Sequence, residues 1–281
     1  MQSLQEIKGR IDGVKTIRKI TKAMQLVSTS KLQRAKKHLN EISEYYQTVF
    51  QVFENIIDNI DDMASVFPKD PKQSKLYVVV SSDLGLCGGY NSNLFKLLKE
   101  DFNIDKDKII ILGTKGVLHF KLNGYKKNIL ESYLNIGEKI EPMIVKEITD
   151  EIMALFMTAE ISEVKIIHTK YINSVTFQTT ATKILPIVKK EKMKNELKLN
   201  AEFEPDATTV FKKALPLYVS AMILGIAVES KVVEMASRRM AMENATDNAD
   251  DISSNLSIQY NRARQASITQ EITEIVAGVD S

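Results

Sequence analysis

The chain has little of what metal sites and disulfides need. It has one cysteine, Cys87, no tryptophan, and three histidines, His38, His119 and His168. A single cysteine cannot form an internal disulfide and fits a reducing compartment. The histidines stand alone in the sequence, without the spacing of a metal site. We therefore expect no metal and no cofactor.

Long hydrophobic runs are also missing. No apolar run approaches the ~20 residues that cross a membrane. The first ten residues, MQSLQEIKGR, lack the apolar core of a signal peptide. We therefore expect no direct membrane span and no signal peptide.

Glycine and proline are absent from two long segments, residues 14–67 and 226–277. These residues interrupt helices, and a usual helix has only ~11–12 residues. Each segment lies against one end of the chain. We predict two helices of about 55–60 residues, each about 80–90 Å long at 1.5 Å per residue.

Apolar periodicity indicates that the two helices pair as an antiparallel coiled coil. One seam follows steps of three and four from residue 32 to residue 60: Leu32, Ala35, Leu39, Ile42, Tyr46, Val49, Phe53, Ile56 and Ile60. Upstream, Val14, Ile17 and Ile20 take two steps of three, which predicts a stammer that overwinds the coil. The second helix carries Met242, Ala245, Ala249, Ile252 and Leu256, then Ile268, Ile272, Ile275 and Val279.

The residues between these helices read as one α/β unit. Buried-strand patterns at 76–81 and 108–112 alternate with helical patterns at 91–102, 113–122 and 140–158, and a hairpin of strands follows at 164–172 and 175–187. Pro216 is expected to begin the last helix. The predicted organisation is a coiled-coil helix at 1–62, a Rossmann-like α/β domain at 75–190 and a second coiled-coil helix at 206–281.

Charge is distributed unevenly although the formal net charge is only +2. Residues 1–37 hold ten Lys and Arg against Glu6 and Asp12, whereas residues 206–281 hold seven against ten acidic residues. All seven arginines lie in the two predicted helices. Arginine is enriched in interfaces, so we expect a partner surface along these helices.

No constellation of residues indicates an enzyme. Gly85, Gly88 and Gly89 follow a strand as a phosphate loop would, but they match neither G-x-G-x-x-G nor Walker A. We interpret them as a turn that packs strand against helix. Cys87 has no neighbouring base in the sequence, and Asp83 is expected to be a turn residue or helix cap.

Four sequence strings resemble the γ subunit family of F-type ATP synthases, and the resemblance covers essentially the whole chain. They are IRKITKAMQLVSTSKLQRA at 17–35, SSDLGLCGGYNSNL at 81–94, RRMAMENATDNA at 238–249 and YNRARQASITQEITEIVAG at 260–278. The resemblance implies an antiparallel coil with a Rossmann-like domain between its helices. It also implies a non-catalytic rotor inside a ring of three α and three β subunits.

The resemblance further implies where partners bind. The stretch expected to meet the β subunits contains Ile20, Thr21, Lys22, Ala23 and Met24. A second set is expected to meet other loops of the ring: Arg262, Arg264, Gln265, Ser267, Thr269 and Glu271. The α/β domain, with Gly85, Cys87, Gly88, Gly89 and Asn91, is expected to meet the ε subunit and the membrane c-ring. The protein would then be peripheral, at the cytoplasmic face of the cell membrane.

Three alternatives stay open at this stage. The same shaft could serve a related soluble rotary ATPase without a membrane ring. A basic helix before a heptad seam also occurs in basic-zipper proteins that bind nucleic acid, but here the seam begins before the basic stretch and no Arg-rich array follows. A nucleotide-dependent enzyme is disfavoured by the missing glycine fingerprint.

Overall fold

The structure is a computed structural model of the chain that describes residues 3–60, 66–137, 139–173, 176–187 and 203–279. It divides into two compact units. The coil unit comprises Met1–Ser30 and Arg238–Ser281, and the body unit comprises Lys31–Ser237. Helices α1, Leu4–Asp58, and α5, Ala207–Val279, contribute residues to both units.

Helix α5 has 73 residues, more than the 55–60 expected from the segment free of glycine and proline. It begins at Ala207, so the prediction that Pro216 starts it is wrong, and Pro216 lies inside the helix. Asp206 sets the start, because its carboxylate accepts hydrogen bonds from the backbone N–H of Thr209 at 2.9 Å and its hydroxyl at 2.7 Å. These bonds hold the pKa of Asp206 below its usual value.

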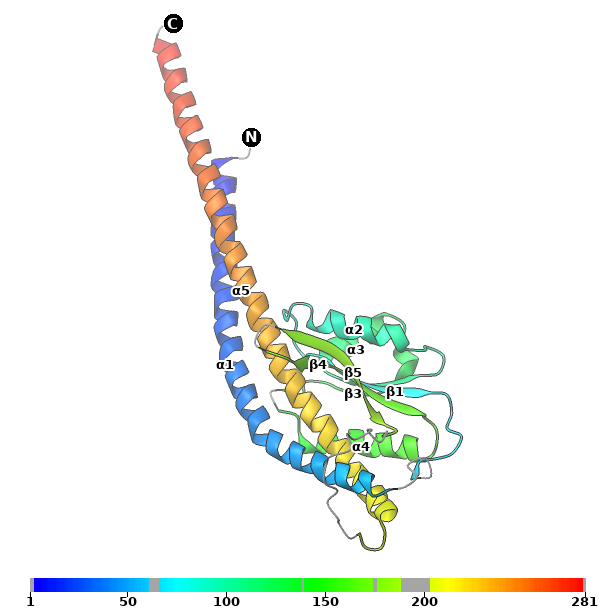
Figure 1. The fold of residues 1–281 in the computed structure, drawn as a ribbon. Helices are drawn as coiled ribbons and strands as arrows, with labels where there is room; N and C mark the ends of the chain where they lie inside the picture. The colour runs from blue at the N-terminus through cyan, green and yellow to red at the C-terminus, as the bar shows by residue number, and fades with distance from the viewer. Residues whose placement is uncertain (1–2, 61–65, 138, 174–175, 188–202, 280–281) are drawn as a thin grey trace. The chain divides into compact units, whose positions relative to one another are not determined.

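In the coil unit the start of α1 runs antiparallel to the end of α5, and α5 extends beyond the start of α1 (Figure 1). Ile7, Ile11 and Leu256 form a small apolar cluster. Further along, the hydroxyl of Thr246 donates a hydrogen bond to that of Thr21 at 2.8 Å. Arg18 forms an ion pair with Asp250. These contacts fix the register of the two helices.

The register shows that the predicted stammer is wrong. Ile17 and Ile20 are 55% exposed, whereas Thr21 and Ser28 are buried. Leu4, Ile7, Ile11 and Val14 alternate steps of three and four. This heptad continues through Arg18, Thr21, Gln25 and Ser28 and reaches the predicted seam at Leu32 without a slip. On α5, Ile252 is likewise exposed and Thr246 is buried. The sequence prediction followed apolar residues, but the inner positions here are polar.

The body unit contains a five-stranded sheet with strand order β3-β2-β1-β4-β5. The strands are β1 Lys75–Val80, β2 Lys108–Leu112, β3 Ile129–Tyr133, β4 Glu163–Tyr171 and β5 Phe177–Leu185. The first four are parallel, and β5 pairs antiparallel with β4. The sequence prediction missed β3, an edge strand with no fully buried residue. The residues of the turn at 174–175 lie outside the described residues.

Helices cover both faces of the sheet (Figure 1). Helices α2, Tyr90–Asp101, and α3, Thr114–Leu122, pack on one face, where Tyr77, Val79 and Ile111 point. The other face packs on α4, Pro142–Met157, and on parts of α1 and α5. The short 3-10 helix η2, Lys126–Asn128, precedes β3. Together with the coil unit, this three-layer body confirms the predicted fold class.

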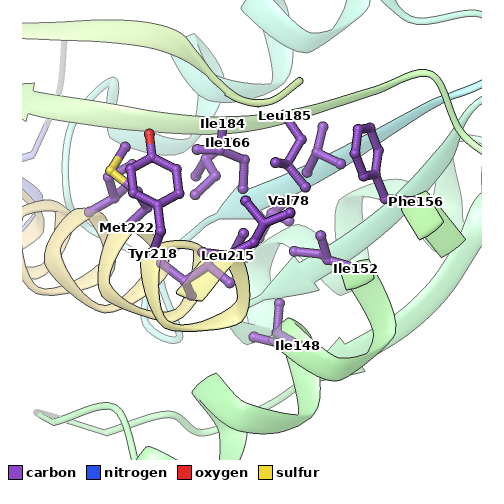
Figure 2. Packing of buried hydrophobic residues seen from close by; sticks show 14 of the residues in the cluster. Val78, Ile148, Ile152, Phe156, Ile166, Ile184, Leu185, Leu215, Tyr218 and Met222 are labelled. Atoms are coloured by element: carbon purple, nitrogen blue, oxygen red, sulfur yellow. The ribbon is translucent and has the colours of Figure 1, made fainter. Parts of the chain in front are cut away.

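The larger core lies between the sheet, α4 and α5 (Figure 2). Val78 and Ile166 of the sheet meet Ile148 and Ile152 of α4, and Leu215 comes from α5. All five side chains are at most 1% exposed. Seam residues Phe53, Ile56 and Ile60 belong to the same core. This part of the predicted seam therefore packs into the body.

Helix α5 also contains an 18-residue window that is long and apolar enough to cross a membrane. The expectation that no segment is long and apolar enough to cross a membrane is therefore not met by composition alone. Half of the window is buried inside the protein. Phe211, Leu215 and Val219 of α5 are fully buried in the body core, and a core helix has the same composition.

Candidate partner-binding surfaces

The coil unit carries apolar side chains on its outside. Ile17, Ile20 and Val27 are 55–56% exposed, and Met24 is half-buried between them. Their spacing of three, four and three residues places them on one side of α1, which we call the outer stripe. Monomeric soluble proteins rarely expose contiguous apolar patches, so the outer stripe is a candidate partner surface.

The structure divides the first predicted contact set. Ile20, Lys22 and Ala23 are exposed and Met24 is half-buried. The Thr21 side chain is instead buried, and its hydroxyl pairs with that of Thr246. Ile17 and Val27 were missed as surface residues. Counting the heptad through Thr21 and Ser28 would have placed both on the outside.

The second predicted contact set lies on α5, past the α1 residues that cover its inner face. Arg262, Arg264, Gln265, Thr269 and Glu271 are exposed. Ser267 is half-buried, and its hydroxyl donates to the Glu271 carboxylate at 3.2 Å. Three apolar residues share this stretch and are exposed to 47%, 57% and 68%: Ile268, Ile272 and Ile275. They therefore do not act as seam residues within the chain.

The third predicted set lies in the loop between β1 and α2. Gly88 and Gly89 are exposed and Gly85 is half-buried, but Cys87 is buried. Asn91 serves the loop itself, because its amide accepts from the Ser82 N–H at 3.1 Å and donates to the Ser82 hydroxyl at 2.7 Å. Cys87 and Asn91 therefore help to hold the loop, and the exposed glycines are the members of this set that lie on the surface.

Two leucines in this loop were missed. Leu84 is 64% exposed and Leu86 is 60% exposed. Leu86 also has a φ of 61°, which is costly for a residue with a branched side chain. Strained and exposed residues are enriched at functional positions. We call Leu84, Gly85, Leu86, Gly88 and Gly89 the loop surface.

Asp83, in the loop after β1, bonds to the start of α3 and to the segment after β3. Its carboxylate accepts from the N–H and hydroxyl of Thr114, the first residue of α3, at 3.1 and 3.2 Å. It also accepts from the N–H groups of Asn135 at 2.9 Å and Gly137 at 3.3 Å. Phosphates bind at such helix N-termini, beyond the carboxyl ends of the strands. Here the Asp83 carboxylate accepts from the first N–H group of α3 and so caps this helix from a distant loop.

The described residues include no group of three or more His, Cys, Asp or Glu side chains that could hold a metal ion. His168, the most buried histidine, lies in β4 and its Nε2 is 2.8 Å from the hydroxyl of Thr182 in β5. Burial lowers the pKa of His168 to about 4. Its surroundings are those of a core residue.

Comparison with known proteins gives a consistent result. The family model described as ATP synthase matches residues 3–281. The ATP synthase gamma chain of Mycoplasmopsis pulmonis is 45% identical over 99% of both chains. That of Mycoplasma mobile is 42% identical over 100% of this chain and 99% of its own. The Clostridium acetobutylicum gamma chain is 36% identical over 98% and 96%.

Solved structures share the fold at lower identity. The rotor of the Euglena gracilis mitochondrial ATP synthase matches with a TM-score of 0.70 at 16% identity, over 94% of this chain and 98% of that one. A second structure of that enzyme, with OSCP, F1 and c-ring, gives 0.73 at 17% identity, over 99% and 93%. Because the family model spans nearly the whole chain and relatives of matching length are 36–45% identical, the chain belongs to the ATP synthase gamma chain family.

Proposed function

We propose that this chain is the central rotor shaft of an F-type ATP synthase and couples rotation to ATP synthesis or hydrolysis in surrounding subunits. One observation carries the proposal beyond family membership. The coil unit buries Thr21 and Ser28 and exposes Ile17, Ile20 and Val27. If the two helices contacted only each other, the apolar side chains would be buried between them and the polar ones would be exposed. A protein partner that covers the outer stripe accounts for this arrangement.

The proposed partners are the α and β subunits, arranged as a ring of three of each. One asymmetric shaft touches each of three identical subunits differently. Its outer stripe therefore biases each catalytic subunit toward a different state through differential contact free energy, which is the requirement for coupling. Ile20, Lys22, Ala23 and Met24 would contact the ring, joined by Ile17 and Val27.

The α5 stretch from Arg262 to Glu271 is proposed as the second ring contact. Its two arginines present planar guanidinium groups suited to carboxylates or carbonyl oxygens. Exposed Ile268, within this stretch, and Ile272 and Ile275, just after it, fit an apolar sleeve. Such a surface suits a shaft end that must turn, because apolar contacts are non-directional.

The loop surface of the body unit is proposed to meet the ε subunit and the c-ring. The chain itself is proposed to be non-catalytic and peripheral at the cytoplasmic face of the membrane. Two observations support the absence of nucleotide chemistry. The Asp83 carboxylate occupies the N-terminal end of α3, and Cys87 is buried among loop groups.

Stoichiometry tests the proposal. The full chain is co-expressed with the α and β subunits of its own organism, and the purified complex is weighed by native mass spectrometry. We expect three α, three β and one copy of this chain. The matched variant Ile17→Ser, Ile20→Ser and Val27→Ser should fold but associate weakly, whereas Lys146→Ser, exposed on α4, should associate normally. Equal numbers of the three chains, or no association, would refute the rotor role.

A further inference from the structure

The outer face of α3 combines exposed leucines with lysines. Leu118 is 48% exposed, and Leu122 is 84% exposed, more than any other large apolar side chain among the described residues. Lys115 and Lys121 are exposed on the same helix. Helical spacing turns these four residues to one side, away from the α3 residues that are buried against the sheet. Two leucines therefore lie between two cations on one helix face.

Helix α2 adds a third cation beside this face. The ring of His119 in α3 stacks on that of Phe95 in α2, with 4.1 Å between the ring centroids. Burial lowers the pKa of His119, and the nearby charge of Lys99 on α2 lowers it further. This places Lys99 at the border between the two helices. We use the name lysine face for Lys99, Lys115, Leu118, Lys121 and Leu122.

No acidic residue offsets the charge of the lysine face. Residues 113–128 contain four lysines, of which Lys126 and Lys127 lie in η2, and no Asp or Glu. Within the described part of the chain, the three lysines of the face form no ion pair. Glu100 follows Lys99, but one step around α2 turns it about 100° further from α3. The lysine face therefore attracts an anionic partner.

The residue types of the lysine face favour a lipid surface over a protein. Arginine is enriched and lysine is depleted in protein interfaces, yet residues 35–237 contain no arginine at all. Lysine is a compact point charge that needs no partner of fixed geometry. Helices that lie in the interface of a membrane combine lysine with leucine in this way. Each lysine near an anionic leaflet strengthens binding by about fivefold.

We propose that the lysine face binds the surface of a membrane that contains anionic lipids. Leu118 and Leu122 enter the boundary between headgroups and acyl chains, while the lysines contact lipid phosphates. The proposal concerns the body unit alone and does not rest on the rotor role, so its failure would leave that role untouched.

Tryptophan fluorescence tests the proposal, because the chain has no tryptophan of its own. Residues 1–37 are also basic, so a reporter at the contact itself is needed. Leu122→Trp in the full-length chain is titrated with vesicles of phosphatidylglycerol and phosphatidylcholine in equal amounts. We expect a saturable blue shift that brominated acyl chains quench and that phosphatidylcholine alone does not produce. The matched reporter Leu217→Trp, at a 51% exposed leucine of α5, should show no shift.

Two double variants, made in the Leu122→Trp chain, assign the charge. Lys115→Gln with Lys121→Gln should raise the half-saturating lipid concentration at least about tenfold, since each lysine contributes about fivefold. Lys212→Gln with Lys213→Gln, at two exposed lysines of α5, should leave it unchanged. All four lysines are exposed, so both variants should keep the melting temperature.

Three results would overturn the proposal: no shift of the Leu122→Trp emission, an equal shift with phosphatidylcholine alone, or equal weakening in the two double variants. Binding of polyglutamate without binding of vesicles would also overturn it, and would assign the lysine face to an acidic protein.

Discussion

At the residue scale, the seam of the coil unit makes a prediction that separates folding from partner binding. Thr21→Val with Thr246→Val replaces a buried hydrogen-bonded pair by apolar groups of the same shape, which is neutral or stabilising by about 1 kcal/mol. We expect the melting temperature of the chain to stay or rise and ATPase coupling to stay unchanged. Ile20→Ser, on the outer stripe, should change stability by less than about 0.5 kcal/mol but weaken coupling. Differential scanning calorimetry and coupled ATPase assays measure both, and the reverse pattern would place Thr21 on the partner surface.

His168 gives the chain a pH-dependent stability. Its folded pKa of about 4 lies below the ordinary value of 6.5, because burial disfavours the charged imidazole. The stabilising contribution is therefore full above pH 6.5 and is lost as the pH falls toward 4. The loss amounts to about 3 kcal/mol over this window, at 1.36 kcal/mol per pKa unit.

His168→Gln removes the titrating group while keeping a side chain that can bond to the Thr182 hydroxyl. Urea unfolding at pH 7.0, 5.5 and 4.5 should show a steep loss of stability for the unchanged chain and a shallower loss for the variant. Parallel curves for the two proteins would show that His168 does not titrate in this range on folding.

At the element scale, the seam of α1 predicts graded damage. Ile56 is 4% exposed in the body core, whereas Ile42 is only partly buried against that core. Ile56→Asp loses apolar burial and buries an unpaired carboxylate, so it should cost more than about 4 kcal/mol and abolish assembled complex. Ile42→Asp should cost clearly less. Sedimentation of co-expressed complexes measures both, and normal yield with Ile56→Asp would contradict the core placement.

The same helices show how far the sequence could be interpreted. The seam from Leu32 to Ile60 was predictable because its residues are apolar and periodic. The stammer was predicted in error because Thr21 and Ser28 are buried, and a buried hydroxyl carries no hydrophobic signal. The start of α5 was misplaced because Pro216 usually marks a first turn, whereas Asp206 supplies the cap here. Strand β3 was missed because an edge strand needs no fully apolar face.

Some of the predicted partner residues could likewise be assigned from the sequence, and others could not. The resemblance named Ile20 and the loop glycines as contact residues, and all but Gly85 are exposed, although apolar periodicity alone had placed Ile20 in the seam. The burial of Thr21 and of Cys87 could not be predicted. It depends on the register between α1 and α5 for Thr21 and on the hydrogen bonds of the loop for Cys87. Leu84 and Leu86 had no sequence signal beyond being apolar in a turn.

At the scale of the whole molecule, the proposed ring contact on α5 and the proposed loop surface of the body unit can be tested separately. Arg262→Ala with Gln265→Ala removes exposed side chains from the ring contact while keeping high helix propensity. Soluble ATPase activity should fall. Gly88→Val places a β-branched residue at a φ of 57° and should distort the loop surface, leaving soluble ATPase largely active while membrane attachment weakens.

Gly89→Ala is the matched control for the loop, because an added Cβ meets only the Asn93 side chain at an ordinary contact distance of 3.4 Å. It should keep both activities. If Gly88→Val loses soluble ATPase and keeps attachment, while the Arg262 and Gln265 variant does the opposite, the assignment of the two surfaces is wrong.

Rotation of this chain inside the ring tests the central claim most directly. Leu122 is 84% exposed at the end of α3 and the native Cys87 is buried, so Leu122→Cys gives one reactive thiol for a gold bead. The ring is fixed to glass through its β subunits and ATP is added. We expect the bead to turn in one direction in steps and to stop when ATP is removed. A complex that hydrolyses ATP at the normal rate while the attached bead stays still would contradict it.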